Sequence, residues 1–149
     1  MPPYLDIYVA TSGRSLTCVD RFLAQYVDLT VESVRDDFEV RLTWNEEGFV
    51  SGTLAATLAY GLAKADRAFT LYFQRKHPAY RCPMLYFSPH GRLLLGLAVE
   101  ETSPEGLPND AVVAQLLQRL KHELSTEYGL IAFELPPEEA DEEFGLTLC

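Results

Sequence analysis

Apolar and polar residues alternate along several short segments of this chain, and this alternation restricts its fold more than any other feature. In the segment 4–11, for example, Leu5, Ile7 and Val9 are separated by tyrosine or aspartate. A period of two places alternate side chains on opposite faces of a β-strand, so these segments predict strands with one buried face. Six segments are predicted to be strands: Tyr4–Thr11, Phe38–Trp44, Phe69–Gln74, Met84–Phe87, Leu93–Glu100 and Leu130–Leu135.

Three other segments have apolar residues three or four positions apart, the spacing of a helix that packs one face on a core. The first runs from about Ser15 to Asp28, and the second from Ser51 to Ala65, where leucines recur every four residues. The third begins at Asn109 or Asp110 and ends before Gly129, a residue suited to the left-handed end of a helix.

The segment that follows the second predicted strand has an alternative interpretation. Residues 45–48 (Asn-Glu-Glu-Gly) form a loop typical of a β-hairpin, which would return the chain into Phe49 and Val50. A hairpin followed by a helix satisfies both patterns, so both stay open.

The order of these elements predicts an α+β fold. Alternating strands indicate that helices cover one face of the sheet and leave the other more open. We expect residues 1–149 to form one domain, a two-layer sandwich with a mixed or mainly antiparallel sheet of about six strands and about three helices on one face. An acidic tail is expected from about residue 136. A three-layer doubly wound fold needs strands that are apolar on both faces, and only Leu93–Val99 has that composition.

The open face of this predicted sheet carries several tyrosines. The residues expected to face the helices are Leu5, Ile7, Phe38, Val40, Phe69, Leu71 and Phe87. Those expected to face away include Tyr4, Tyr8, Arg41, Tyr72 and Tyr86. Because Tyr and Arg are enriched at binding hot spots, this face is a candidate interface. Ordinary packing between tyrosines of neighbouring strands is the alternative.

Charge is unevenly distributed along the chain. Its 22 Asp and Glu against 12 Lys and Arg give a net charge of −10. Residues 1–63 hold nine acids and four bases, residues 64–92 one acid and six bases, and residues 93–149 twelve acids and two bases. This excess of acid disfavours nucleic acid and anionic membranes as partners and favours a basic protein. Pairs such as Glu46–Glu47 and Glu100–Glu101 are the candidate contacts.

No motif predicts catalysis, a cofactor or a metal. Arg14 and Ser15 at the start of the first helix are suited to hold an anion, but the chain lacks the glycine-rich phosphate-binding motifs. His77, Cys82 and His90 lack the paired spacing and the fourth ligand of a zinc site. The residues before the first strand lack a basic start, so no signal peptide is predicted, and three unpaired cysteines fit a reducing cytoplasm.

These observations lead to two functional hypotheses. The first is a small acidic intracellular module that binds proteins without catalysis, in one version an inhibitor or immunity protein that neutralises a basic toxin or nuclease by occlusion. The second is a small enzyme or ligand-binding regulatory domain with a pocket between helices and sheet. Its candidate polar groups are Arg14, Ser15, His77 and His90. The binding residues of the first hypothesis are Tyr4, Tyr8, Arg41, Tyr72, Tyr86, Glu46, Glu47, Glu100 and Glu101.

Overall fold

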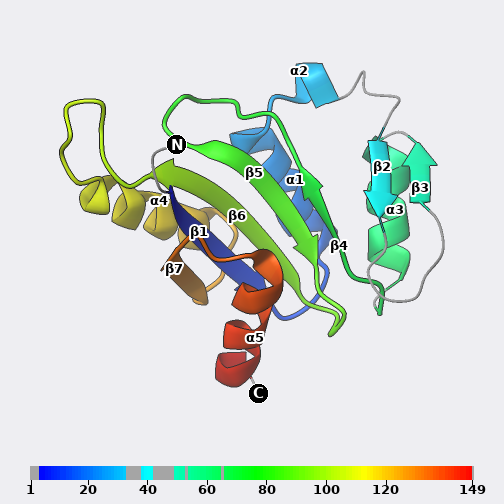
Figure 1. Cartoon of the computed structure of the whole chain (residues 1–149). Helices are drawn as coiled ribbons and strands as arrows, with labels where there is room; N and C mark the ends of the chain where they lie inside the picture. The colour runs from blue at the N-terminus through cyan, green and yellow to red at the C-terminus, as the bar shows by residue number, and fades with distance from the viewer. Residues whose placement is uncertain (1–3, 33–37, 42–48, 53, 65, 149) are drawn as a thin grey trace.

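A computed structural model describes residues 4–32, 38–41, 49–52, 54–64 and 66–148 of the chain (Figure 1). Five strands form one antiparallel sheet in the order β4-β5-β6-β1-β7, and two more form a separate hairpin. The strands are β1 (Tyr4–Thr11), β2 (Phe38–Arg41), β3 (Phe49–Gly52), β4 (Phe69–Tyr72), β5 (Arg81–Phe87), β6 (Leu93–Glu100) and β7 (Gly129–Phe133). The helices are α1 (Leu16–Tyr26), α2 (Leu29–Glu32), α3 (Leu54–Ala63), α4 (Asp110–Glu123) and α5 (Pro137–Leu148).

Strand β1 lies inside the sheet, between two strands that come much later in the chain. Ile7 is opposite Leu97 of β6 on one side and Ile131 of β7 on the other. All pairings in the sheet are antiparallel, so the predicted α+β class and the mainly antiparallel sheet are confirmed. The sheet has five strands where about six were expected, because Phe38–Arg41 pairs with β3 in the separate hairpin.

Helices α1 and α4 cover one face of the sheet, behind it in the view of Figure 1. Helix α1 begins at Leu16 because the Ser15 hydroxyl accepts a hydrogen bond from the backbone N–H of Cys18 at 3.3 Å. The apolar faces of both helices pack on the strand residues that the alternation assigned to this side. Ile7, Phe69, Leu71 and Phe87 are fully buried there, Leu5 is partly buried, and the side chains of Phe38 and Val40 lie outside the described residues.

Helix α3 lies close to the sheet because of one glycine. A Cβ atom on Gly61 would lie 2.6 Å from Cζ of Phe69 and 2.7 Å from Cε1 of Phe87. Glycine therefore allows the helix to approach these rings, which stack with their centroids 4.4 Å apart. Hairpin and helix are both present in this part of the chain, since β3 returns along β2 before α3 begins.

Helix α5 lies on the opposite face of the sheet, in front of it in Figure 1. Its Ala140 and Phe144 are buried against Tyr86 and Leu94. The expectation of helices on one face only is therefore wrong, and Pro137–Leu148 of the expected acidic tail form this helix. The sequence did not predict this packing because the segment is rich in acidic residues and its apolar face is short. In the part of the chain that the structure describes, no helix has the length and apolar composition needed to cross a membrane.

Candidate binding groove

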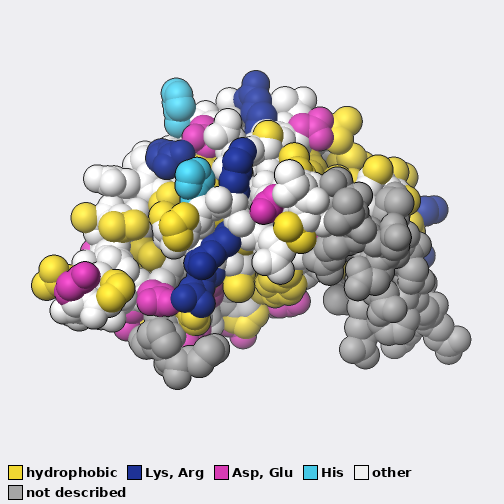
Figure 2. Space-filling model, turned by 90° about the horizontal axis from the view of Figure 1, so that it is seen from above, with side chains coloured by type: hydrophobic (Ala, Val, Ile, Leu, Met, Phe, Trp, Pro, Cys, Tyr) yellow, Lys and Arg dark blue, Asp and Glu magenta, His cyan; other side chains and the backbone are white. Residues whose placement is uncertain are grey.

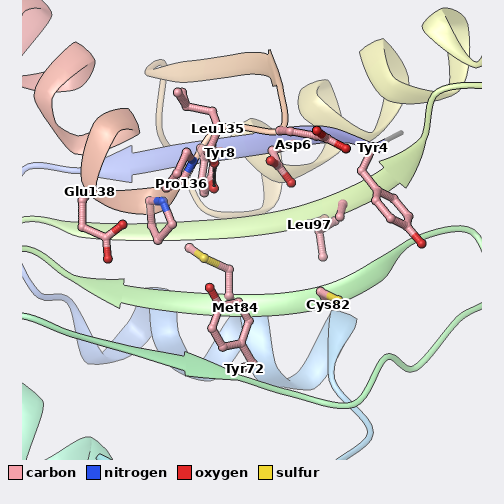
Figure 3. Close-up of a pocket in the computed structure, with 13 residues that line it drawn as sticks. Tyr4, Asp6, Tyr8, Tyr72, Cys82, Met84, Leu97, Leu135, Pro136 and Glu138 are labelled. Carbon is pink, nitrogen blue, oxygen red and sulfur yellow. Dashed lines mark hydrogen bonds between the residues drawn. The ribbon is translucent and has the colours of Figure 1, made fainter. Parts of the chain in front are cut away.

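A hollow of about 450 Å³ lies on this second face of the sheet, beside the start of α5 (Figure 3). The strands form its floor, and the chain that leads from β7 into α5 forms one wall. We call this hollow the groove. Its described lining residues are Tyr4, Asp6, Tyr8, Tyr72, Cys82, Met84, Leu97, Ala98, Glu134, Leu135, Pro136, Pro137 and Glu138.

The position of Tyr8 in the groove depends on a glycine in the neighbouring strand. Gly96 is opposite Tyr8, and a Cβ atom there would lie only 3.0 Å from Cδ1 of the tyrosine ring. The ring therefore occupies space that another residue at position 96 would fill. The hydroxyl of Tyr8 donates a hydrogen bond to the carbonyl of Leu135, which holds the wall of the groove against its floor. Burial raises the pKa of Tyr8, so the hydroxyl keeps its proton for this bond.

Asp6 is a half-buried carboxyl group in the groove. It is opposite Ala98 on one neighbouring strand and Ala132 on the other, and these small side chains leave space around it. Burial raises its pKa from 3.8 to about 6, and the charge of Glu134 adds to this effect. A hydrogen bond from the backbone of Leu135 opposes the shift. A cation that entered the groove would favour the ionised form of this carboxyl.

Aromatic and acidic side chains form the rim of the groove. Figure 3 shows Tyr72 and Met84 on one side and Pro136 and Glu138 on the other. The Tyr72 side chain is 57% exposed, so much of its ring is available to a ligand. Asp6, Glu134 and Glu138 bring three carboxyl groups to the groove, and none of its described lining residues is Lys or Arg. Carboxylates beside aromatic faces are a combination that attracts ammonium and guanidinium groups.

The structure separates the predicted site residues into two groups. Tyr4, Tyr8 and Tyr72 all line the groove. Tyr86 does not, because α5 covers it and leaves it 3% exposed; this burial raises its pKa to about 12. Tyr86 is therefore a core residue in this structure and presents no surface to a partner.

The predicted acidic residues lie away from the groove or outside the described residues. Glu100 is half-buried and pairs with Arg81 at 2.9 Å, and the guanidinium of Arg81 lies 6.0 Å from the centroid of the Tyr4 ring. The carbonyl of Glu101 accepts a hydrogen bond from the backbone of Asn109. Neither glutamate lines the groove. Glu46 and Glu47, and the side chain of Arg41, lie outside the described residues.

Sequence reasoning missed the three acids that do line the groove. Asp6 lies between Tyr4 and Tyr8 in the alternation of β1, so the same pattern that selected the tyrosines also places this carboxyl beside them. Glu134 and Glu138 flank the two prolines that end the last predicted strand. Nothing local in that segment indicates that the chain turns back over the sheet.

The polar groups named for a ligand-binding domain do not converge on a pocket. The guanidinium of Arg14 donates to four backbone carbonyls, those of Gly61, Lys64, Arg67 and Ser88. It therefore ties α3 and the following turn to the end of β5 and is not directed at an anion. Ser15 caps α1, and His77 and His90 are exposed. Among the described residues, no three His, Cys, Asp or Glu side chains are grouped so that they can hold a metal ion.

Basic side chains gather on a different side of the molecule. Figure 2 shows Lys and Arg in a row, with His beside them, across the face seen from above. Exposed bases of the connection between β4 and β5 include Arg75 and Lys76, which donate to the carbonyls of Tyr80 and Ala24. The six bases of residues 64–92 do not all lie together, because Arg92 is bound to Asp141 beneath α5.

No protein-family model matches the chain, and neither a curated protein nor a solved structure matches it. The function is therefore inferred from the geometry of the groove.

Proposed function

We propose that this chain is a protein-binding module whose groove accepts a lysine- or arginine-bearing segment of a basic partner. The observation that carries the proposal is the lining of the groove, which has three carboxyl groups and three tyrosines but no base among its described residues. A volume of about 450 Å³ is suited to a long cationic side chain with part of its backbone.

Each part of the groove has a role in this interaction. Glu134 and Glu138 offer carboxylates at its wall, where they pair with the incoming cation. The ring of Tyr72, more than half exposed, provides an aromatic face for the same charge. Asp6 lies deeper and gains a favourable partner when a cation replaces the water around it.

Occlusion is the mode of action that this arrangement supports. A net charge of −10 speeds the approach of a basic protein, and binding of one of its cationic segments in the groove covers the surface around that segment. An inhibitor or immunity protein directed at a basic toxin or nuclease is the concrete form of this proposal. The partner's cationic side chains near its active site are then the groups that enter the groove.

The test is partner capture with two charge-matched variants. The groove variant carries Glu134→Gln and Glu138→Gln, and the control carries Glu139→Gln and Glu142→Gln, two exposed positions of α5 that do not line the groove. Tagged proteins are expressed in the cell of origin and purified at low salt, and the bound proteins are identified by mass spectrometry.

We expect a basic protein that the unmodified chain and the control variant retain, that the groove variant loses, and that high salt releases. A partner retained equally by the groove variant contradicts the proposal. Equal loss from both variants also contradicts it, because overall charge alone would then explain the binding.

A further inference from the structure

We infer that β7 pairs with β7 of a second copy of this chain, so that the two sheets become continuous across a two-fold axis. β7 is the last strand of the sheet order, and β1 is its one neighbour among the described strands. Figure 1 shows it at the margin of the sheet. The other end of the sheet is better covered, since β2 lies beside β4 and Val27 forms a bridge with Arg75 just beyond β4.

The composition of this edge lacks the features that protect natural edge strands. The strand reads Gly-Leu-Ile-Ala-Phe, with no charge and no proline. The side chains of Ile131 and Phe133 are 38% and 56% exposed. Lysine, proline or a bulge normally prevents such an edge from pairing, so an apolar edge without them is a pairing surface.

Two hydrogen bonds define which backbone groups of β7 face outward. The N–H of Glu134 donates to the carbonyl of Tyr4, and the N–H of Ala10 donates to the carbonyl of Tyr128, both at 3.2 Å. Hydrogen-bonded pairs alternate along an antiparallel ladder, so the even-numbered residues of β7 bond to β1. Gly129, Ile131 and Phe133 therefore direct their N–H and C=O groups away from the sheet.

The edge formed by these three residues is complementary to the same edge of a second copy. If Ile131 lies opposite its own copy, Gly129 lies opposite Phe133 of the second copy, and all outward backbone groups are paired. A Cβ on Gly129 would lie 2.6 Å from Cε of Lys121 and 2.7 Å from Cδ1 of Leu117, so these two side chains of α4 cover Gly129 and the incoming Phe133 ring packs beside them. The same register places Glu134 opposite Tyr128 of the second copy, so no glutamates oppose each other. This match favours a second copy over an unrelated strand.

Cysteine cross-linking tests the register. Ile131→Cys is introduced into a chain with Cys82→Ser and Cys149→Ser. The proposed pairing holds the two Cα atoms of residue 131 about 5.5 Å apart, within the range of a disulfide. The matched control is Phe133→Cys, which is more exposed but whose copies lie roughly 13 Å apart along the strand in this register. We expect the first variant to form a covalent dimer under mild oxidation and the second to form no covalent dimer. Cross-linking of the second variant as fast as the first overturns the proposal.

The mass in solution provides an independent measurement on the chain without added cysteines. We expect light scattering to give twice the chain mass of 16.8 kDa at high concentration. Ile131→Lys places two ammonium groups opposite each other and should weaken the dimer about tenfold or more. The control, Leu107→Lys, adds the same charge at a position that is 64% exposed and outside β7, and should have no effect. A monomer at all concentrations, or a dimer that Ile131→Lys leaves unchanged, overturns the proposal. The inference does not rest on the groove, which lies on a face of the sheet and not on its edge.

Discussion

Asp6 makes the stability of the folded chain depend on pH. Its pKa is about 6 in the folded state, compared with an ordinary value of 3.8. Between these values the folded protein retains a proton that the unfolded chain releases, so the free energy of unfolding falls as the pH rises. The loss is nearly complete by about pH 7 and absent below about pH 4.

Replacing the Asp6 carboxyl group with an amide removes this loss of stability at high pH. We expect Asp6→Asn to raise the free energy of unfolding by about 1 to 2 kcal/mol at pH 8 and by much less at pH 4. The value at pH 8 is smaller than the full pKa shift implies, because solvent reaches part of the group. Urea denaturation at the two pH values measures the difference. Asp20→Asn, at an exposed position of α1, is the control. An equal gain at both pH values contradicts a raised pKa for Asp6.

The same proton couples to binding. A cation in the groove favours the ionised carboxylate, so a partner must displace the proton of Asp6 at low pH. We expect the affinity for the partner to increase between pH 5 and pH 7.5, and this increase to be smaller in Asp6→Asn. Titration calorimetry in two buffers of different ionisation enthalpy detects the released proton. A pH profile that is identical in the variant shows that Asp6 does not contact the cation.

Arg14 contributes to stability through the planar shape of its guanidinium. One of its contacts joins it to the carbonyl of Ser88 at 2.7 Å, and the group also lies 5.1 Å from the centroid of the Phe87 ring. Lysine keeps the charge but has three donors on a single nitrogen in place of the planar fork, so it cannot reach all four carbonyls. We expect Arg14→Lys to lower the free energy of unfolding by about 2 kcal/mol, measured by urea denaturation. Arg21→Lys, which loses one long bond to the carbonyl of Glu123, should change it by less than about 0.5 kcal/mol.

At the scale of elements, α5 is held to the sheet by a buried ion pair. Asp141, 3% exposed, accepts hydrogen bonds from the Ser88 hydroxyl at 2.7 Å and from Nε of Arg92 at 3.0 Å. Both donors lie in or beside the turn between β5 and β6. The attachment of the helix therefore depends on the buried Asp141 carboxylate and on its two donors in this turn.

Removing one partner of this pair should release the helix. We expect Asp141→Ala to lower the free energy of unfolding by about 3 kcal/mol, because Arg92 remains buried without its counter-ion. Limited proteolysis should then cut near residues 134–137 before the rest of the chain. Glu139→Ala, exposed on the same helix, should alter neither measurement. A stable variant that still resists proteolysis at this site would show that the apolar contacts of Phe144 suffice.

The elements differ in how far local sequence determines them. The alternation in β1 and β4 reports directly which side chains face α1, so those strands and their buried residues were predictable. Helix α5 was not, because its buried side chains up to residue 145 are only Pro137, Ala140, Asp141 and Phe144. The groups that bind Asp141 lie about fifty residues earlier. One signal did indicate a cover on the second face. β6 is apolar on both sides, and its Leu94 is fully buried beneath α5.

The residues of the groove also differ in how far local sequence predicts them. The tyrosines of the groove follow from the period of two in β1 and β4, which places Tyr4, Tyr8 and Tyr72 on one face. The exclusion of Tyr86 and the inclusion of Glu134 and Glu138 both depend on the path of the chain after β7. That path is determined by contacts between segments that are far apart in sequence, and a local sequence pattern does not predict such contacts.

For the whole molecule, the two proposed interactions should respond to salt in opposite directions. Binding of a basic partner brings unlike charges together, so added salt weakens it. Pairing of two chains of charge −10 brings like charges together, so salt strengthens it. We expect one NaCl series from 50 to 300 mM, followed by sedimentation, to raise the fraction of homodimer and lower that of the complex. A homodimer that dissociates as salt is added would assign its contacts to charge and not to β7.

The central position of β1 also constrains the order in which this fold can assemble. Its neighbours, β6 and β7, begin at residues 93 and 129, so a growing chain contains no partner for its first strand until most of the domain has been synthesised. Loops of this length make sheet closure slow compared with the formation of helices such as α1. During translation both edges of β1 therefore remain unpaired until β6 and β7 follow, and unpaired strand edges make such a nascent chain prone to aggregation.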